Sequence, residues 1–217
     1  IIFFGFGCSI MFLSLLQAHN IMNNYQQIFE NNRKWVTEKK ASDNAFFEKL
    51  SKDQQPGFLY IGCSDSRVPA EEITGARPGE MLVHRNVANQ VDPSDSNAMS
   101  VIHFAVTELH VSHIVVCGHY MCGGIKAAME GELGAPLGTW LQPIRVLASK
   151  HRNELEAIDN LDGRFRRLVE INVQAQCETV VNLPVTQELF WGTGFPQVHG
   201  WVFNMHTGEL IDLNFQP

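Results

Sequence analysis

The alternation of apolar and polar positions along the chain predicts strands separated by helices. Short apolar runs occur at 58–62, 81–84 and 113–118, and their β-branched and aromatic residues are typical of buried strands in a parallel sheet. Between these runs, apolar residues recur at steps of three and four, which is the spacing of an amphipathic helix. The pattern therefore predicts an α/β fold: a mainly parallel central β-sheet flanked by helices.

Local start signals place several of the helices. Asp95 and Ser96 form a predicted N-cap for a helix that runs to Leu109, and Pro69 opens a short helix that ends near Ile73. Three further helices are predicted over 123–129, 140–158 and 161–183.

The two ends of the chain carry patterns of their own. Residues 23–50 show helical spacing with charges between the apolar positions, and they predict an N-terminal helical arm with Ser42 as the N-cap of its second segment. Residues 198–204 and 209–213, with a turn between them, predict a C-terminal β-hairpin-like pair.

The segment before this arm is apolar. Its apolar run, Ile1–Leu16, is interrupted only by Ser9 and Ser14, and no charge precedes Glu30. This run is shorter than the ~20 residues of a membrane span, so no stable membrane insertion is expected. Because Ile1 is not a start residue, we interpret 1–22 as an apolar extension that is a fragment end or a targeting remnant. Residues 23–217 are then the single predicted domain.

Composition narrows the function and the compartment. The chain has 217 residues, a net charge of −7 and scattered Lys and Arg residues, so we expect no nucleic-acid partner. Its five cysteines are widely spaced, which predicts metal-bound or buried thiols in a reducing compartment. The cytoplasm is the expected location, and a mitochondrion or plastid is the alternative because of the apolar extension.

Two short clusters carry the candidate chemistry, and each follows a predicted strand. Open parallel sheets bind ligands beyond the carboxyl ends of their strands. The thiolates of Cys63 and Cys122 and the imidazole of His119 are ligands that suit Zn²⁺, and Asp65 is a candidate for the fourth position. The sequence therefore predicts one zinc site.

The spacing within each cluster supports this prediction. Cys63, Asp65 and Arg67 alternate, so in an extended loop their side chains leave on the same side and Arg67 meets the Asp65 carboxylate. His119 and Cys122 are three positions apart, which places both on one face of a turn entering a helix.

Residues beyond the ligands also bear on the site. The glycines at 123 and 124 would let backbone amides approach whatever occupies the site.

These motifs resemble the β-class carbonic anhydrases. The likeness rests on Cys-Ser-Asp-Ser-Arg at 63–67, on His119 and on Cys-Gly-Gly at 122–124, and it extends from about Asn31 to the C-terminus. It implies a zinc lyase that hydrates carbon dioxide reversibly to bicarbonate and a proton by a zinc-bound hydroxide. It also implies that Cys63, His119 and Cys122 hold the zinc.

The resemblance implies roles for further residues. Asp65 and Arg67 would form a catalytic dyad: paired with Arg67, Asp65 leaves the fourth position to water, and released, it becomes a ligand of a closed site. Gln54, Phe104 and Gly123 would line the substrate pocket, with Gln54 reaching the site of a neighbouring subunit. A homodimer, or a homotetramer built from it, would then be the working unit.

The resemblance also shows a departure. Bicarbonate-regulated members of this class use a Trp, an Arg and a Tyr at a second bicarbonate site. The matching positions here are Tyr60, Arg85 and Phe203, so we expect inhibition by bicarbonate to be weak or absent.

Three alternatives stay open at this point. The same scaffold could hydrolyse another small heterocumulene such as carbon disulfide, because selectivity would come from the access route. The four candidate ligands could instead form a closed structural zinc site, although such sites seldom use Asp. A thiol redox role for Cys117 and Cys122 is the third alternative.

Overall fold

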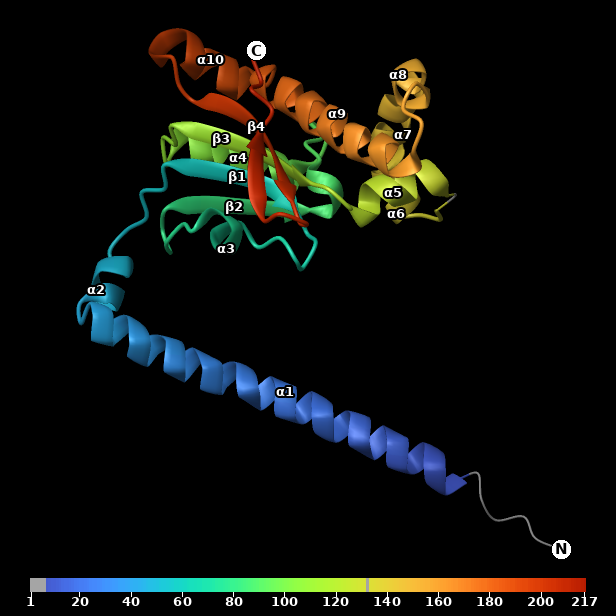
Figure 1. The fold of residues 1–217 in the computed structure, drawn as a ribbon. Helices are drawn as coiled ribbons and strands as arrows, with labels where there is room; N and C mark the ends of the chain where they lie inside the picture. Colours follow the sequence, from blue (N-terminus) through green and yellow to red (C-terminus); the bar gives the residue numbers. More distant parts are fainter. Residues whose placement is uncertain (1–6, 132) are drawn as a thin grey trace, which may run out of the picture. The chain divides into compact units, whose positions relative to one another are not determined.

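The computed structural model describes residues 7–131 and 133–217, and it divides the chain into two compact units, Ile1–Asp53 and Gln54–Pro217 (Figure 1). This division concerns compactness alone. The predicted boundary between an extension at 1–22 and a domain at 23–217 therefore stays a prediction, and residues 1–6 lie outside the described part.

The first unit is helical, which confirms the predicted arm. It contains α1 (Gly7–Ser42) and α2 (Phe46–Leu50), and α1 reaches back into the segment left outside the fold prediction. The prediction that Ser42 caps the second segment is wrong. Ser42 is the last residue of α1, and the Asp43 carboxylate instead accepts a hydrogen bond from the backbone N–H of Ala45.

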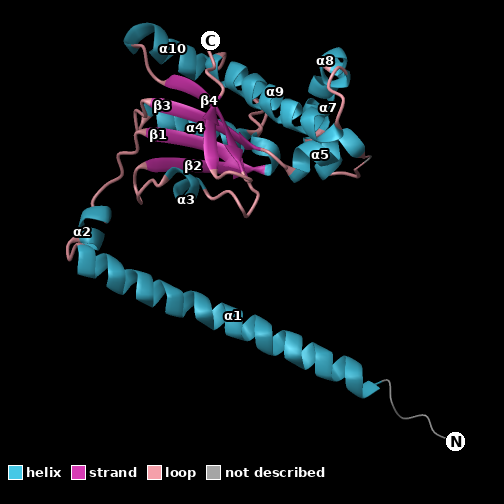
Figure 2. Ribbon diagram, viewed as in Figure 1, coloured by secondary structure: helices cyan, strands magenta, loops and turns pink. Residues whose placement is uncertain are grey.

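The second unit is built on one sheet. Its strands are β1 (Phe58–Cys63), β2 (Met81–Asn86), β3 (His113–His119), β4 (Gln197–Asn204) and β5 (Glu209–Asp212). Their spatial order is β2-β1-β3-β4-β5, and every neighbouring pair is parallel except the closing β4–β5 pair (Figure 2). The mainly parallel sheet and the C-terminal hairpin-like pair are both confirmed.

The register of the sheet positions the site. β1 lies between β2 and β3, with Phe58 opposite both Met81 and His113. Because the three strands run in the same direction from this shared start, their carboxyl ends meet at one edge. Cys63 ends β1 and His119 ends β3 at that edge.

Helices join and follow the strands. They are α3 (Ala70–Thr74), the 3₁₀-helix η1 (Val87–Asn89), α4 (Ser96–Thr107), α5 (Gly123–Glu130), α6 (Leu137–Trp140), α7 (Gln142–Lys150), α8 (Arg152–Glu156), α9 (Leu161–Val181) and α10 (Pro184–Thr193). Asp95 caps α4 as predicted, its side chain accepting from the Asn97 N–H.

Two helix predictions need correction. The single helix predicted over 140–158 is divided among α6, α7 and α8, with breaks at Leu141 and at His151. The pattern also missed α10, which begins at Pro184. A proline is tolerated in the first turn of a helix, where its missing N–H has no intrahelical partner to lose.

The core lies on both faces of the sheet, and α9 covers β3 and β4 on one of them (Figure 1). This approach is close at Gly118, where a Cβ would lie 2.7 Å from a methyl group of Val173. Glycine at the last position before His119 therefore lets α9 pack directly against the carboxyl end of β3.

Among the described residues, no helix combines the length and apolarity needed to cross a membrane.

Candidate metal centre

Three predicted ligands converge at the carboxyl edge of the sheet. Cys63 and His119 end their strands, and Cys122 precedes the first residue of α5. All three are buried, and their ligand atoms lie within 4.8 Å of one another. The two sulfurs are 3.9 Å apart, close to the separation of about 3.8 Å that tetrahedral Zn–S bonds of ~2.3 Å impose.

The orientation of His119 fits a metal ligand. Its Nδ1–H donates to the backbone carbonyl of Tyr120 at 3.0 Å, which leaves Nε2 as the free lone pair. Nε2 is buried and has no hydrogen-bond partner among the described residues. A buried acceptor without a donor is costly unless something binds it, so the residues present fit a bound Zn²⁺.

A strained turn brings His119 and Cys122 together. Met121 has a φ of 63°, in the left-handed region that residues with a Cβ seldom adopt. This conformation turns the chain sharply from β3 into α5. The two ligand side chains then face the same point, as the three-residue spacing predicts.

Asp65 and Arg67 form a two-pronged ion pair beside the ligands. Arg67 Nε and Nη2 donate to the two carboxylate oxygens of Asp65 at 2.9 and 2.7 Å, and the Arg67 backbone N–H also donates to Asp65 Oδ1. Asp65 Oδ2 lies 3.8 Å from His119 Nε2. The Arg67 hydrogen bonds hold the pKa of the Asp65 carboxyl well below its usual range, so Asp65 is ionised at neutral pH.

The two ligand thiols share their protons unequally in the metal-free protein. The hydrogen bond from the Cys122 thiol lowers the pKa of Cys63 to about 4, helped by His119 and by the backbone N–H of Ala88. The neighbouring Cys63 sulfur and burial raise the pKa of Cys122. The hydrogen bond therefore favours the anionic form of Cys63, which is the form that binds a metal.

Cys117 and Cys177 behave as buried apolar residues. Burial raises the pKa of Cys117 to about 12, and it also raises the pKa of Cys177. Cys117 belongs to the apolar cluster on one face of the sheet, whereas Cys122 belongs to the cluster on the other. This separation argues against a redox pair of Cys117 and Cys122.

The predicted pocket residues are divided between the two edges of the sheet. Gly123 begins α5 beside Cys122, with open space where a Cβ would point. Gln54 precedes β1, and Phe104 lies in the last turn of α4, which leads to the amino end of β3; both are exposed. A six-residue strand spans about 17–20 Å, so one chain does not bring Gln54 or Phe104 to its own metal ligands.

Arg85 has a structural role that the sequence did not reveal. Its guanidinium donates to the backbone carbonyls of Cys63, at 2.8 Å, and of Asp65. It thereby fixes the loop that carries both side chains. Tyr60, the neighbouring position of the implied bicarbonate site, is fully buried, and burial raises the pKa of its hydroxyl.

Residues on other elements also reach the metal centre. The backbone N–H of Ala88 donates to Cys63 Sγ at 3.4 Å, and Asn172 on α9 donates to the Ala88 carbonyl at 3.0 Å. Asn172 and Gln176 interrupt the apolar stripe of α9 with buried polar side chains. That interruption is the sequence feature that could have identified them, since a buried amide is costly unless it is hydrogen-bonded.

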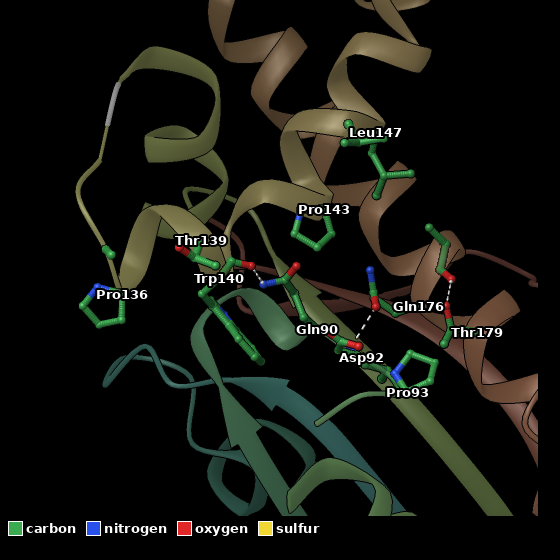
Figure 3. Close-up of a pocket in the computed structure, with 14 residues that line it drawn as sticks. Gln90, Asp92, Pro93, Pro136, Thr139, Trp140, Pro143, Leu147, Gln176 and Thr179 are labelled. Atoms are coloured by element: carbon green, nitrogen blue, oxygen red, sulfur yellow. Dashed lines mark hydrogen bonds between the residues drawn. The ribbon is translucent and has the colours of Figure 1, made fainter. Parts of the chain in front are cut away.

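The cavity in Figure 3 is separate from the predicted site. It has a volume of about 770 Å³, lies between residues 90–93, residues 135–147 and α9, and contains none of the predicted site residues. A smaller cavity of about 480 Å³ reaches Cys122 and is walled partly by Phe165 and Arg166 of α9.

Known proteins resemble this chain in sequence and in fold. A family profile described as carbonic anhydrase matches residues 58–210. The carbonic anhydrase of Emericella nidulans is 52% identical over 190 residues, which cover 88% of this chain and 83% of that protein.

Solved structures agree. One of two tetrameric β-carbonic anhydrases from Sordaria macrospora has a TM-score of 0.86 and 39% identity, covering 88% of this chain and 98% of that one. The Coccomyxa β-carbonic anhydrase in complex with acetazolamide has a TM-score of 0.81 and 37% identity, covering 86% and 85% of the two chains.

Metal analysis of the purified protein tests the centre. We expect about one zinc per chain in the wild type and a large loss in Cys63→Ser, because a neutral hydroxyl is a poor replacement for a thiolate. Cys177→Ser is the matched control, since Cys177 is also buried and its thiol donates to the His199 carbonyl, away from the three candidate ligands. Equal zinc content in wild type and Cys63→Ser would contradict the assignment.

Proposed function

The chain belongs to the carbonic anhydrase family, in its β class, and from that membership we propose that it uses one Zn²⁺ to hydrate carbon dioxide reversibly, with Asp65 and Arg67 gating the site. Carbon dioxide hydration is the general reaction of this family, and the enzyme is a lyase. The observation that carries the proposal is the convergence of Cys63, His119 and Cys122 on one buried point.

The three candidate ligands would contribute different charges to the metal site. When bound, Zn²⁺ supplies a Lewis acid that lets water ionise near neutral pH and attack carbon dioxide. Cys63 and Cys122 would contribute two negative charges, and His119, held through Nδ1 by the Tyr120 carbonyl, would contribute a neutral donor. Three protein ligands leave one position for the reaction.

Asp65 would govern that remaining position. Held by Arg67 on both carboxylate oxygens, it is an ionised hydrogen-bond acceptor beside His119 that can orient a water molecule without itself binding the metal. Released from Arg67, it is close enough to turn toward the three ligands and become the fourth. Arg67 is thus the residue that we propose keeps Asp65 away from the metal, and its half-exposed side chain can move without disturbing the core.

A second copy of the chain would complete the substrate pocket. Gly123 leaves room beside Cys122, whereas Gln54 and Phe104 lie exposed at the opposite edge of the sheet. A homodimer in which these two residues reach the partner's metal centre accounts for that placement, and a homotetramer could pair two such dimers. On this proposal the catalytic domain is 23–217, and 1–22 is an extension to it.

The alternative substrate is another linear heterocumulene, carbon disulfide. The same ligands and the same dyad would serve it, because the reacting group is attacked at its central carbon in both cases. No contact in the described residues favours it over carbon dioxide.

A direct assay separates these two substrates. We expect the wild type to hydrate carbon dioxide and to leave carbon disulfide essentially unchanged, and Cys63→Ser to lose the first activity. Stopped-flow measurement of proton release from carbon dioxide, beside sulfide release from carbon disulfide, provides both numbers. Turnover of carbon disulfide alone would overturn the proposed substrate.

Removing Arg67 should impair the gate rather than the fold. We expect Arg67→Ala to lower kcat for carbon dioxide hydration by about 10–100-fold, because a freed Asp65 competes for the fourth position. Binding of an inhibitory anion such as azide should weaken in parallel. Arg152→Ala, which removes another exposed arginine paired with a glutamate, is the control. A fully active Arg67→Ala variant would contradict the proposed role of Arg67.

Activity should rise from neutral to mildly alkaline pH. Two thiolates offset the charge of the ion, so water at this site should be less acidic than at a site with three imidazoles. Asp65 does not cause the rise, because its pKa is held below the usual ~3.9 and its carboxylate stays charged through the whole range. A profile of kcat/KM from about pH 6 to about pH 9 measures this; a flat profile would contradict it.

A further inference from the structure

The loop that follows β2 approaches the metal centre with its backbone in a strained conformation. Ala88 and Asn89 have φ values of 65° and 47°, which residues with a Cβ rarely adopt. Both residues are fully buried. In this conformation the Ala88 N–H donates to Cys63 Sγ at 3.4 Å. Strain of this kind persists only where surrounding contacts impose it.

Two buried amides on α9 impose it. Asn172 Nδ2 donates to the Ala88 carbonyl at 3.0 Å, and Gln176 Oε1 accepts from the Val91 N–H at 2.8 Å. Gln176 Nε2 donates to Asn172 Oδ1 at 3.1 Å and so fixes the first amide with the second. The pair, one helical turn apart, holds the loop from both sides of Asn89.

A second set of hydrogen bonds joins the loop to Trp140. Trp140 Nε1 donates to the Val87 carbonyl, and Gln90 Nε2 donates to the Trp140 carbonyl, each at 2.8 Å. In Figure 3 the Gln90 side chain reaches toward the backbone of Trp140, and Gln176 lies in the same cavity wall. The loop is therefore anchored on both sides of Asn89, at Val87 and Ala88 before it and at Gln90 and Val91 after it, and the Ala88 N–H is directed at a metal ligand.

The same loop also touches the second ligand segment. A Cβ on Gly124 would lie 3.0 Å from Val87 Cγ1 and 3.1 Å from Ala88 Cβ. Gly124 follows Cys122 by two positions, so a shift of the loop would press on the start of α5. Cys63 and Cys122 thus share one support.

We propose that Asn172 and Gln176 are positioning residues for the metal centre: they hold the strained Ala88 amide against Cys63 Sγ and so set the donor strength of that thiolate toward the metal. The inference rests on the proposed function, since it takes Zn²⁺ to be the bound ion. Hydrogen bonds to an anionic acceptor are strong, and groups that orient metal ligands commonly govern affinity.

The test uses metal-loaded protein and does not depend on activity. In Asn172→Ala we expect zinc affinity, measured by competition with a chelator, to fall by about 10–100-fold. In the cobalt-substituted protein, the thiolate-to-cobalt absorption band should move to lower energy, because a sulfur without its N–H donor gives up electrons more easily. The Ala88 amide proton should move upfield in the NMR spectrum of the zinc form.

Two further variants make the result specific. Thr179→Ala, on the next turn of α9, removes a hydroxyl that donates to the Ala175 carbonyl of the same helix, and it should leave all three readouts unchanged. Ala88→Gly in the Asn172→Ala background should restore part of the affinity and the band position, since glycine adopts positive φ without strain. If Asn172→Ala fails to fold, Gln176→Met should show the same changes.

The outcomes separate the two proposals. A zinc-loaded wild type whose Asn172→Ala and Gln176→Met variants keep its affinity, its band and its amide shift would overturn the positioning role alone. A wild type that binds no zinc would overturn the proposed function, and the positioning role with it.

Discussion

The parallel pairing of β1 with β3 is the constraint on which the rest of the site depends. Because both strands run the same way and start opposite one another, Cys63 and His119 end at the same edge of the sheet. The sharp turn at Met121 then adds Cys122. Two sulfurs and one imidazole nitrogen are thus held close together in a buried space, where leaving the His119 Nε2 lone pair without a partner is unfavourable. The fold creates a site that a metal ion stabilises.

Buried polar side chains behind the ligands fix the orientation of the segments that carry them. An amide in an apolar helix face destabilises a protein unless its hydrogen bonds are satisfied, and Asn172 and Gln176 satisfy theirs with each other and with the loop after β2. Arg85 acts similarly on the loop after β1, through the Cys63 carbonyl. The sheet supplies the positions of the ligands, and these side chains supply their orientation. Strain at Ala88 is the local cost, offset by the bonds that hold it.

Electrostatics separates a fixed part of the site from a movable part. The thiols and His119 are buried and can reorient little, whereas the Asp65–Arg67 pair lies at the surface, with Arg67 half exposed. Because the Arg67 side chain is half exposed, it can leave Asp65 for water without disturbing packed residues. That contrast suits a gate beside a rigid centre. The exposed positions of Gln54 and Phe104 at the far edge of the sheet point in turn to completion by another copy of the chain.

The sequence by itself determined the order of strands and helices as far as α9, the parallel sheet and the three residues that converge at the candidate metal centre, because these follow from local periodicity and from side-chain chemistry. Only the tertiary structure decided where the 140–158 helix breaks, that α10 exists, and that Ser42 ends a helix instead of starting one. It also revealed Asn172, Gln176 and the strained Ala88. Their roles depend on contacts between segments more than eighty positions apart, and no pattern within a local window records which distant carbonyl a buried amide will meet.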